Sequence, residues 1–323
     1  MCQFSPGDTL GGYTIIRELG RGNNGIVYLA KQNILDRLVA CKVLLSGNAA
    51  ESGYVEAFFR EARNAAKLSH PNIVQALDVG NENGCCYFIM EYVDGEMLET
   101  IRIENPARFT PLFLLPLAVQ LADALDYAWR SHKMIHGDIK PENIMLQHGG
   151  TVAKLADLGV ARVAGAQTDD GLMATPLYVA PEVVMGNTQA DPRSDIYSFG
   201  VMLYELFDGN PPFTGRAEEL IRKHVNEYPV SMTEAVPGLD FELASFIDRM
   251  LIKSPDVRPQ SWLEVKETLQ RIWERLKKEN IPSAKPAVWR APAVGFKMPQ
   301  WAKMLLAIVG AVFLAWLIIR IFA

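Results

Sequence analysis

The sequence predicts an α+β fold with two lobes, a small β-rich lobe followed by a larger helical one. Residues 13–43 are rich in β-forming residues and contain a glycine-rich turn, whereas from Leu112 onward apolar residues recur at helical spacing. Hydrophobic residues make up 49% of the chain and charged residues 21%, which favours a packed core over disorder. The net charge of −5 argues against nucleic-acid binding, which normally requires a basic patch.

Each lobe follows from local patterns. In the first lobe, β-rich segments predict strands at residues 13–16, 26–30, 38–45, 73–79 and 86–91. A helix is expected between the third and fourth of these strands, over residues 54–68, because its apolar residues recur at helical spacing. The helices expected in the second lobe cover residues 114–132, 194–207, 217–228, 241–252 and 262–278.

The four cysteines, Cys2, Cys41, Cys85 and Cys86, predict no disulfide and no zinc site. Cys85 and Cys86 are neighbours on a predicted strand and point to opposite faces, so they are poorly placed to bridge each other. No CxxC spacing is present. We expect reduced, packed thiols in a reducing compartment. The first nine residues lack the charged and apolar regions of a signal peptide, so the N-terminal domain is expected in the cytoplasm.

The C-terminal part of the sequence predicts a linker and a membrane span. Residues 281–303 contain four prolines and no clear periodicity, which is typical of a linker. Residues 304–323 follow, apolar without a break as far as Ile319, and 20 residues of helix measure about 30 Å, the thickness of one bilayer core. The alternative is a buried core helix, but no domain follows the linker to bury it. Basic residues in the linker place that side in the cytoplasm.

Small residues recur along the predicted span. Ala307, Ala311 and Ala315 are spaced four residues apart, and Gly310 lies beside them. Such spacing lets two transmembrane helices approach closely and suggests a weak homodimer. Ordinary alanine content in a membrane span gives the same pattern, so this alternative stays open.

A glycine-rich loop lies between the first two predicted strands. Gly20, Gly22 and Gly25 form a GxGxxG pattern, in which the missing Cβ atoms let the backbone approach phosphates closely. By itself the pattern also fits an ordinary hairpin turn or a dinucleotide-binding loop. A dinucleotide-binding loop opens a helix, whereas here the strand that contains Val27 follows. A strand–loop–strand of this kind is typical of a loop that covers nucleotide phosphates.

Two further motifs carry charged side chains. Alternation along the third strand puts Ala40 and Lys42 on one face, under the glycine-rich loop, and Glu61 on the following helix offers a carboxylate that can orient the lysine. The segment from Ile135 to Met145 is the strongest signal. In it, Asp138 can accept a proton from a substrate hydroxyl, and an amide that can ligate metal follows five residues later. Further on come an Asp-Leu-Gly at 157–159 and an Ala-Pro-Glu at 180–182.

In their order, these motifs resemble the Hanks-type Ser/Thr protein kinases from about residue 13 to residue 273. The resemblance implies a bilobal protein-kinase fold over residues 13–276 that uses ATP and Mg²⁺ and acts on Ser and Thr hydroxyls of protein substrates. It implies that Asp138 is the catalytic base and that Lys140 steadies the transferred phosphate. Asn143 and Asp157 would hold Mg²⁺.

The resemblance also implies roles for residues around the nucleotide. Lys42 and Glu61 would form an ion pair. Glu91 and Val93 would offer backbone groups to adenine, with Met90 as the gatekeeper. The other residues matched in this way are Glu96 and Glu142 at ribose or substrate contacts, Glu182 paired with Arg258, and Asp195 as a brace of the catalytic loop.

Three positions depart from the family pattern. Gly137 stands where many members have an arginine that binds the activation-loop phosphate, Leu158 replaces a phenylalanine, and Ala174 replaces a glycine. With Gly137 in place we expect substantial activity without phosphorylation at Thr168, whereas the hydroxyl of Thr175 is expected to contact the catalytic loop.

Two alternative functions remain open. The His-Gly-Asp triplet at 136–138 is typical of small-molecule phosphotransferases of related fold, such as aminoglycoside phosphotransferases, although these usually lack the Ala-Pro-Glu segment. A membrane-bound pseudokinase scaffold is the other alternative, against which the intact Lys42, Asp138, Asn143 and Asp157 argue.

Overall fold

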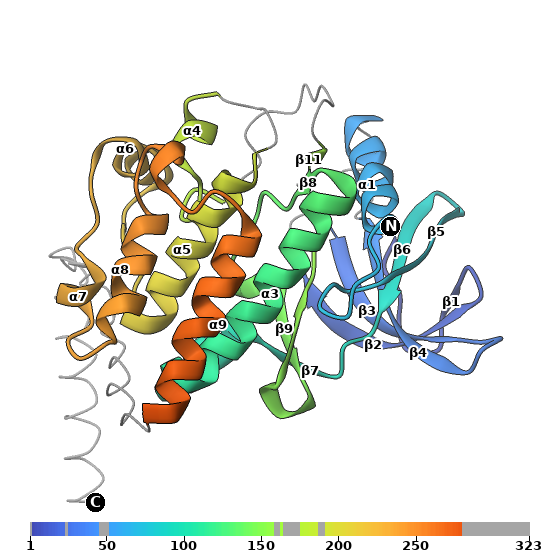
Figure 1. The fold of residues 1–323 in the computed structure, drawn as a ribbon. Helices are drawn as coiled ribbons and strands as arrows, with labels where there is room; N and C mark the ends of the chain where they lie inside the picture. The colour runs from blue at the N-terminus through green and yellow to red at the C-terminus, as the bar shows by residue number, and fades with distance from the viewer. Residues whose placement is uncertain are drawn as a thin grey trace, which may run out of the picture. The chain divides into compact units, whose positions relative to one another are not determined.

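The structure is a computed structural model that describes residues 2–22, 25–44, 52–157, 162–163, 175–186 and 191–279. Two lobes are visible in Figure 1, a β-rich N-lobe with one long helix and a C-lobe built mostly from helices. The predicted two-lobed α+β fold is therefore confirmed. The predicted linker at 281–303, the predicted span at 304–323 and its alanine motif lie outside the described residues.

The N-lobe is an antiparallel sheet of six strands with one helix on a face. The strands are β1 (Thr9–Leu10), β2 (Tyr13–Arg21), β3 (Gly25–Gln32), β4 (Arg37–Leu44), β5 (Ala76–Glu82) and β6 (Cys85–Glu91), in the order β1-β2-β3-β4-β6-β5. Helix α1 (Ser52–Ala65) buries Phe58 and Ala62 in one apolar cluster with Phe88 of β6. On the opposite face, Ile15, Tyr28 and other alternate residues form a separate cluster.

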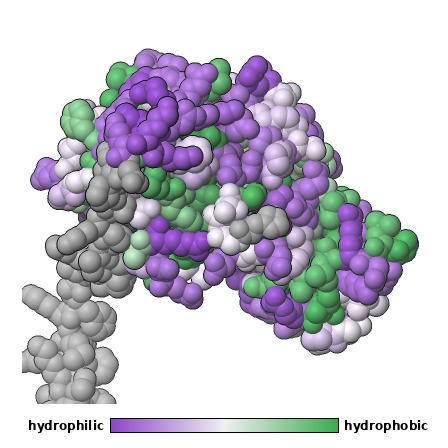
Figure 2. All heavy atoms as spheres, turned by 60° about the horizontal axis from the view of Figure 1, so that its bottom comes forward, coloured by the Kyte–Doolittle hydropathy of each residue, from purple (hydrophilic) through white to green (hydrophobic). Residues whose placement is uncertain are grey.

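The surface of the N-lobe carries exposed apolar side chains. In the space-filling view they gather at the right-hand end of the molecule, which is the N-lobe (Figure 2). Ile34 and Leu35, in the turn between β3 and β4, are 91% and 60% exposed. No described residue of the chain covers these two side chains.

The C-lobe is built around helix α3 (Pro111–His132), which packs along α9 (Trp262–Glu279). Thr110 caps the start of α3 by accepting a hydrogen bond from the backbone amide of Phe113, and Lys133 ends the helix in the left-handed conformation. The other helices are α2 (Leu98–Glu104), α4 (Pro181–Val184), α5 (Pro192–Asp208), α6 (Ala217–Asn226), α7 (Met232–Ala235) and α8 (Phe241–Met250).

Among the helices of the described part of the chain, α3 is the one whose length and apolar composition would allow it to cross a membrane. Most of its leucine side chains, however, lie in the core of the C-lobe with α5, α8 and α9. Burial in this core accounts for its apolar composition, as expected of the central helix of a helical lobe.

Short strands at the junction of the lobes were not predicted as a group. β7 (Gly95–Met97), β9 (Ile144–Gln147) and β10 (Val152–Leu155) form a three-stranded sheet, and β8 (Met134–Ile135) pairs with β11 (Arg162–Val163). These strands hold the loops of the cleft, and each is too short to give a clear alternation in the sequence. The predicted strand at 73–79 begins later, at Ala76, because residue 73 makes a single bridge to Leu155 instead.

One expectation about the cysteines is wrong. Cys2 and Cys85 form a disulfide, with their Cα atoms 5.5 Å apart, whereas all four thiols were expected to be reduced. The partner of Cys85 is not its neighbour Cys86 but a residue 83 positions away in the sequence, which no local pattern indicates. Cys41 and Cys86 are free and buried, as expected.

Candidate active site

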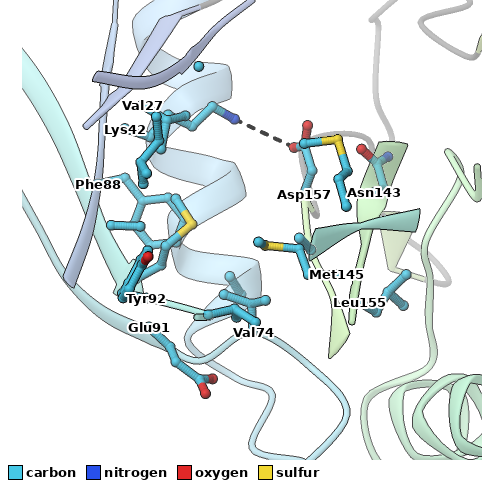
Figure 3. A pocket seen from close by; sticks show the side chains of 18 of the residues that line it. Val27, Lys42, Val74, Phe88, Glu91, Tyr92, Asn143, Met145, Leu155 and Asp157 are labelled. Atoms are coloured by element: carbon cyan, nitrogen blue, oxygen red, sulfur yellow. Dashed lines mark hydrogen bonds and ion pairs between the residues drawn. The ribbon is translucent and has the colours of Figure 1, made fainter. Parts of the chain in front are cut away.

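A pocket lies in the cleft between the lobes, under the glycine-rich loop (Figure 3). Apolar side chains from both lobes form its walls, and charged side chains gather at one end. Its lining includes the predicted residues Gly20, Val27, Ala40, Lys42, Glu61, Glu91, Val93, Asn143 and Asp157. The pocket thus brings together residues from at least six separate segments of the chain, as expected for a site built where two lobes meet.

The three glycines of the loop have different surroundings. A Cβ atom added at Gly20 or Gly22 would meet no other atom within 4 Å, so packing within the lobe does not require glycine at either position. At Gly25 a Cβ atom would lie 2.6 Å from the backbone carbonyl oxygen of Val43. Gly25 is therefore required for the close pairing of β3 with β4, which is a role that the motif alone did not indicate.

Lys42 reaches from β4 toward two carboxylates. Its Nζ atom lies 2.7 Å from Oε1 of Glu61 on α1 and 3.5 Å from Oδ1 of Asp157, the contact drawn in Figure 3. Burial disfavours the charged lysine, but Asp157 and Glu61 outweigh it and raise its pKa. Burial also raises the pKa of Glu61, to about 7. The ammonium group is therefore fixed in its charged form between the two lobes.

Asp157 follows β10 in an unusual backbone conformation. Its φ is 57°, in the left-handed region, where residues other than glycine are uncommon. Such conformations persist only where the surrounding structure holds them, and they concentrate at functional sites. Here the turn aims the carboxylate back across the pocket toward Lys42.

The loop after β8 carries a compact polar network. Oδ1 of Asp138 accepts a hydrogen bond of 2.6 Å from the hydroxyl of Thr175, and its Oδ2 lies 2.5 Å from Nζ of Lys140. The same lysine donates to the Thr175 hydroxyl at 2.9 Å. Asn143 donates through its amide nitrogen to the carbonyl oxygen of Asp138 at 2.7 Å, so its own side-chain oxygen is the atom left to meet a cation.

Asp195, on α5, holds this loop from below. Its two carboxylate oxygens accept hydrogen bonds from the backbone amides of His136, at 2.6 Å, and Gly137, at 2.8 Å. Gly137 has a φ of 80°, a conformation that suits glycine. A buried carboxylate that binds two amides in this way fixes the backbone on which Asp138 depends.

Comparison with known proteins agrees with this geometry. A protein kinase domain model matches residues 13–273. The serine/threonine-protein kinase pkn2 of Myxococcus xanthus is 36% identical over 270 residues, which are 80% of this chain and 32% of that protein. PknB of Mycobacterium tuberculosis is 35% identical over 273 residues, which are 80% of this chain and 42% of that protein. The chain belongs to the protein kinase family.

Solved kinase domains share the fold. The crystal structure of the Mycobacterium tuberculosis PknI kinase domain superposes with a TM-score of 0.65 at 29% identity, covering 83% of this chain and 99% of that one. The apo form of PpkA-294 superposes with a TM-score of 0.71 at 25% identity and similar coverage. This kinase chain spans only about a third to two-fifths of the length of the curated relatives it matches.

The segment that links the lobes places two predicted adenine contacts in the kinase pocket. Glu91 and Val93 both line it, but the carboxylate of Glu91 points away from the pocket in Figure 3 and pairs with Lys154 at 2.7 Å. The backbone of Glu91 is thus the part that faces the pocket. Glu96, by contrast, is exposed and lies outside the pocket lining, with its carboxylate 3.6 Å from Arg108.

Some kinase residues at the site were missed in the sequence. Met145 of β9, Leu155 of β10 and Val74 line the pocket across from Val27 (Figure 3). The alternation of buried and partly buried residues in β9 is the signal that could have found Met145. Val74 lies in an irregular segment, where no periodicity exists to be read.

The expected pair of Glu182 and Arg258 is present in the C-lobe. The guanidinium contacts the carboxylate through two hydrogen bonds of 2.7 and 2.8 Å, and it is fully buried. It also donates to three backbone carbonyls, including that of Arg193. The segment that ends at Glu182 is therefore anchored to the helices below it. Thr168 and the side chain of Arg162 lie outside the described residues.

Proposed function

We propose that this chain is a Ser/Thr protein kinase that transfers the γ-phosphoryl group of ATP to Ser and Thr hydroxyls of proteins. The observation that carries the proposal is the network around Asp138, whose carboxylate is held by Thr175 and Lys140 and also accepts a hydrogen bond from Asn143 of the pocket lining. A carboxylate fixed there can orient a substrate hydroxyl and accept its proton, while Lys140 offsets negative charge on the transferred group.

The remaining charged residues suit the phosphates of ATP. Lys42, oriented by Glu61, can bind the α- and β-phosphates below the open space at Gly20. Asp157 and the side-chain oxygen of Asn143 are hard oxygen donors, and Mg²⁺ is typically held by one or two carboxylates together with phosphate oxygens. When bound, Mg²⁺ would neutralise negative charge on the phosphates.

A direct assay separates this function from its alternatives. Purified full-length chain with ATP and a basic protein substrate should phosphorylate Ser and Thr, and Asp138→Asn should not. A pseudokinase scaffold would bind ATP without transfer, and a small-molecule phosphotransferase would modify an aminoglycoside but not the protein. Either of these outcomes would overturn the proposal.

Membrane anchoring is the second part of the proposed function. It rests on the apolar sequence of residues 304–319 and on the basic residues before it, which place the kinase domain in the cytoplasm. The full chain should remain with membranes after alkaline extraction, whereas a chain ending at Asn280 should be soluble and active. Release of the full chain by alkali would contradict the anchor.

A weak homodimer through Ala307, Ala311 and Ala315 would raise the local concentration of the kinase and favour autophosphorylation. Replacing Ala307 and Ala311 with isoleucine should lower the yield of crosslinked dimer in membranes. Replacing two other apolar residues of the span, Leu305 and Ile308, with isoleucine and leucine controls for general changes in packing. Equal crosslinking in both variants would remove the idea.

Regulation without a loop phosphate follows from Gly137. This residue has no side chain to bind a phosphate, and its amide is already bound to Asp195. We expect phosphatase-treated enzyme to be substantially active, and Thr168→Ala to change the rate little. Treated enzyme that loses nearly all activity and regains it on autophosphorylation would refute this.

A further inference from the structure

The two edges of the N-lobe sheet meet. In the order β1-β2-β3-β4-β6-β5, β1 and β5 are at opposite edges. Nevertheless the hydroxyl of Tyr13, at the start of β2, donates to Asp78 of β5 at 3.0 Å, and the amide of Gly11 donates to the Glu82 carboxylate at 2.5 Å. The sheet is therefore curled so that the turn between β1 and β2, at one edge, reaches β5 at the other.

Tyr87 fills the space where these edges meet. A Cβ atom at Gly11 would lie 2.0 Å from the Tyr87 hydroxyl, and one at Gly80 would lie 2.3 Å from it. Both positions thus require glycine, and Gly11 also has a φ of 58°. The contact between the edges is consequently a specific, closely packed feature of this lobe.

The segment before β1 lies across this junction. Phe4 packs edge-on against the ring of Tyr28, and its backbone amide donates to the Tyr28 hydroxyl at 3.2 Å. Cys2 is 7% exposed and belongs to the same apolar cluster as Tyr13 and Tyr87. The disulfide then joins Cys2 to Cys85 at the start of β6. We call residues 2–8 the strap.

The disulfide borders a hollow that small reagents can enter. A hollow at the surface of the lobe is lined by both of its cysteines together with Phe4, Glu82 and Asn83. Neither Cys41 nor Cys86 lines this hollow, and burial raises the pKa of the Cys41 thiol to about 12. Thiol exchange needs a thiolate and a path to the sulfur, and of the four cysteines Cys2 and Cys85 are the two that border this hollow.

We propose that Cys2 and Cys85 are a reversible redox clasp that fixes the strap across the two edges of the curled sheet. The oxidant is a small-molecule disulfide such as glutathione disulfide. The thiolate of Cys85 attacks one of its sulfurs, releases one small thiol and forms a mixed disulfide. The thiolate of Cys2 then displaces the second small thiol. Two protein thiols are oxidised, one small disulfide is reduced to two thiols, and the two protons pass to the leaving thiolates.

The clasp acts at the far ends of two strands that reach the nucleotide pocket. β2 begins at Tyr13 and carries Gly20 near its other end, and β6 runs from Cys85 to Glu91. A more rigid sheet lowers the ordering cost of binding. This consequence rests on the proposed function, so we expect ATP to bind severalfold more weakly to the reduced enzyme, on the order of two- to fivefold.

The test measures the thiols and the stability separately from ATP. Full-length chain in detergent is equilibrated in glutathione buffers that span a wide range of reduced-to-oxidised ratios, and free thiols are trapped by alkylation and located by mass spectrometry. We expect Cys2 and Cys85 to pass together from alkylated to disulfide-bonded within the range. The melting temperature without nucleotide should rise by several degrees on oxidation, because a cross-link restricts the unfolded chain.

Matched variants identify the pair. Cys2→Ser and Cys85→Ser should each abolish the dependence of melting temperature on the buffer, whereas Cys86→Ala, next to the pair, should retain it. If a variant fails to fold, the melting temperature of the wild-type enzyme with and without dithiothreitol gives the same comparison without a substitution. The proposal is overturned if both thiols stay alkylated in the most oxidising buffer, or if the disulfide persists in the most reducing one. If Cys2 and Cys85 pass between the reduced and the disulfide-bonded forms as expected but neither form binds ATP, the result counts against the proposed function and not against the clasp.

Discussion

Acid should destabilise this kinase domain through His224 on α6. The imidazole is fully buried, its Nε2 lies 3.0 Å from the carbonyl oxygen of Leu177, and its Nδ1 lies 2.9 Å from the hydroxyl of Tyr197. A carbonyl only accepts, so Nε2 carries the proton and Nδ1 accepts from the tyrosine. Both ring nitrogens of the neutral imidazole thus have a hydrogen-bond partner. Through Leu177 the ring connects α6 with the segment that carries Thr175, the residue that contacts Asp138.

The pKa of His224 sets the size of the effect. Burial, followed by the charge of Lys253, lowers this pKa from 6.5 to about 4. Below pH 6.5 the unfolded chain therefore binds a proton that the folded one refuses, so stability is lost as the pH falls from 6.5 toward 4. The gap between the two pKa values is worth roughly 3 kcal/mol in full, of which about 2 kcal/mol is lost by pH 5.

The assay is urea unfolding of residues 1–279 and of its His224→Gln variant at pH 7.5 and pH 5. Glutamine removes the titrating group, so the stability difference between wild type and variant should change by about 2 kcal/mol between the two pH values. His132→Gln, at the partly exposed end of α3, controls for the loss of an imidazole. If wild type and His224→Gln lose stability in parallel, the argument from burial is refuted.

Three further predictions concern the pocket, the network around Asp138 and the ion pair of Glu182 with Arg258. Lys42→Met and Asp157→Asn should each lower kcat/KM at least about 100-fold with an unchanged circular dichroism spectrum, and turnover like wild type would contradict their contact with phosphate and metal. Thr175→Val should lower kcat roughly tenfold or more, whereas Thr175→Ser keeps the hydroxyl and most of the rate, and equal rates would remove its role in orienting the catalytic carboxylate. Arg258→Met should lower the free energy of unfolding in urea by about 3–5 kcal/mol because it leaves the buried carboxylate of Glu182 without its cationic partner. Adding Glu182→Gln should recover part of this loss. Equal stability of the single and double variants would argue against a charge left unpaired.

The disulfide shows where local reasoning fails. Strand alternation makes the adjacent Cys85 and Cys86 poorly placed to pair with each other, and Cys86 is a free, buried thiol. The partner of Cys85 came from residue 2, and the curl of the sheet brings it there. No periodicity records how far a sheet curls, because curl depends on side chains such as Tyr87 packing against distant glycines.

In the pocket, too, local sequence patterns do not reveal contacts between residues that are distant in the chain. The motifs located the residues that line it, since glycine spacing and strand alternation are local properties. The contact of Gly25 with the carbonyl of Val43 is not local, and neither is the pairing of Glu91 with Lys154. The motif assigns Gly25 to the phosphate loop, but its contact with Val43 shows that it is also needed for strand pairing. The sequence assigns Glu91 to the nucleotide, but the ion pair with Lys154 leaves its backbone, and not its carboxylate, facing the pocket.

By itself the sequence determined the two-lobed α+β fold, the family and the set of charged residues at the cleft, because each depends on short-range patterns of burial and on spacing within one loop or helix. The tertiary structure decided which of these residues meet. The separation of 115 positions between Lys42 and Asp157, and of 83 between Cys2 and Cys85, is spanned only after the sheet has curled and the lobes have packed. Those contacts are set by the packing of the whole domain, and a local pattern carries no information about them.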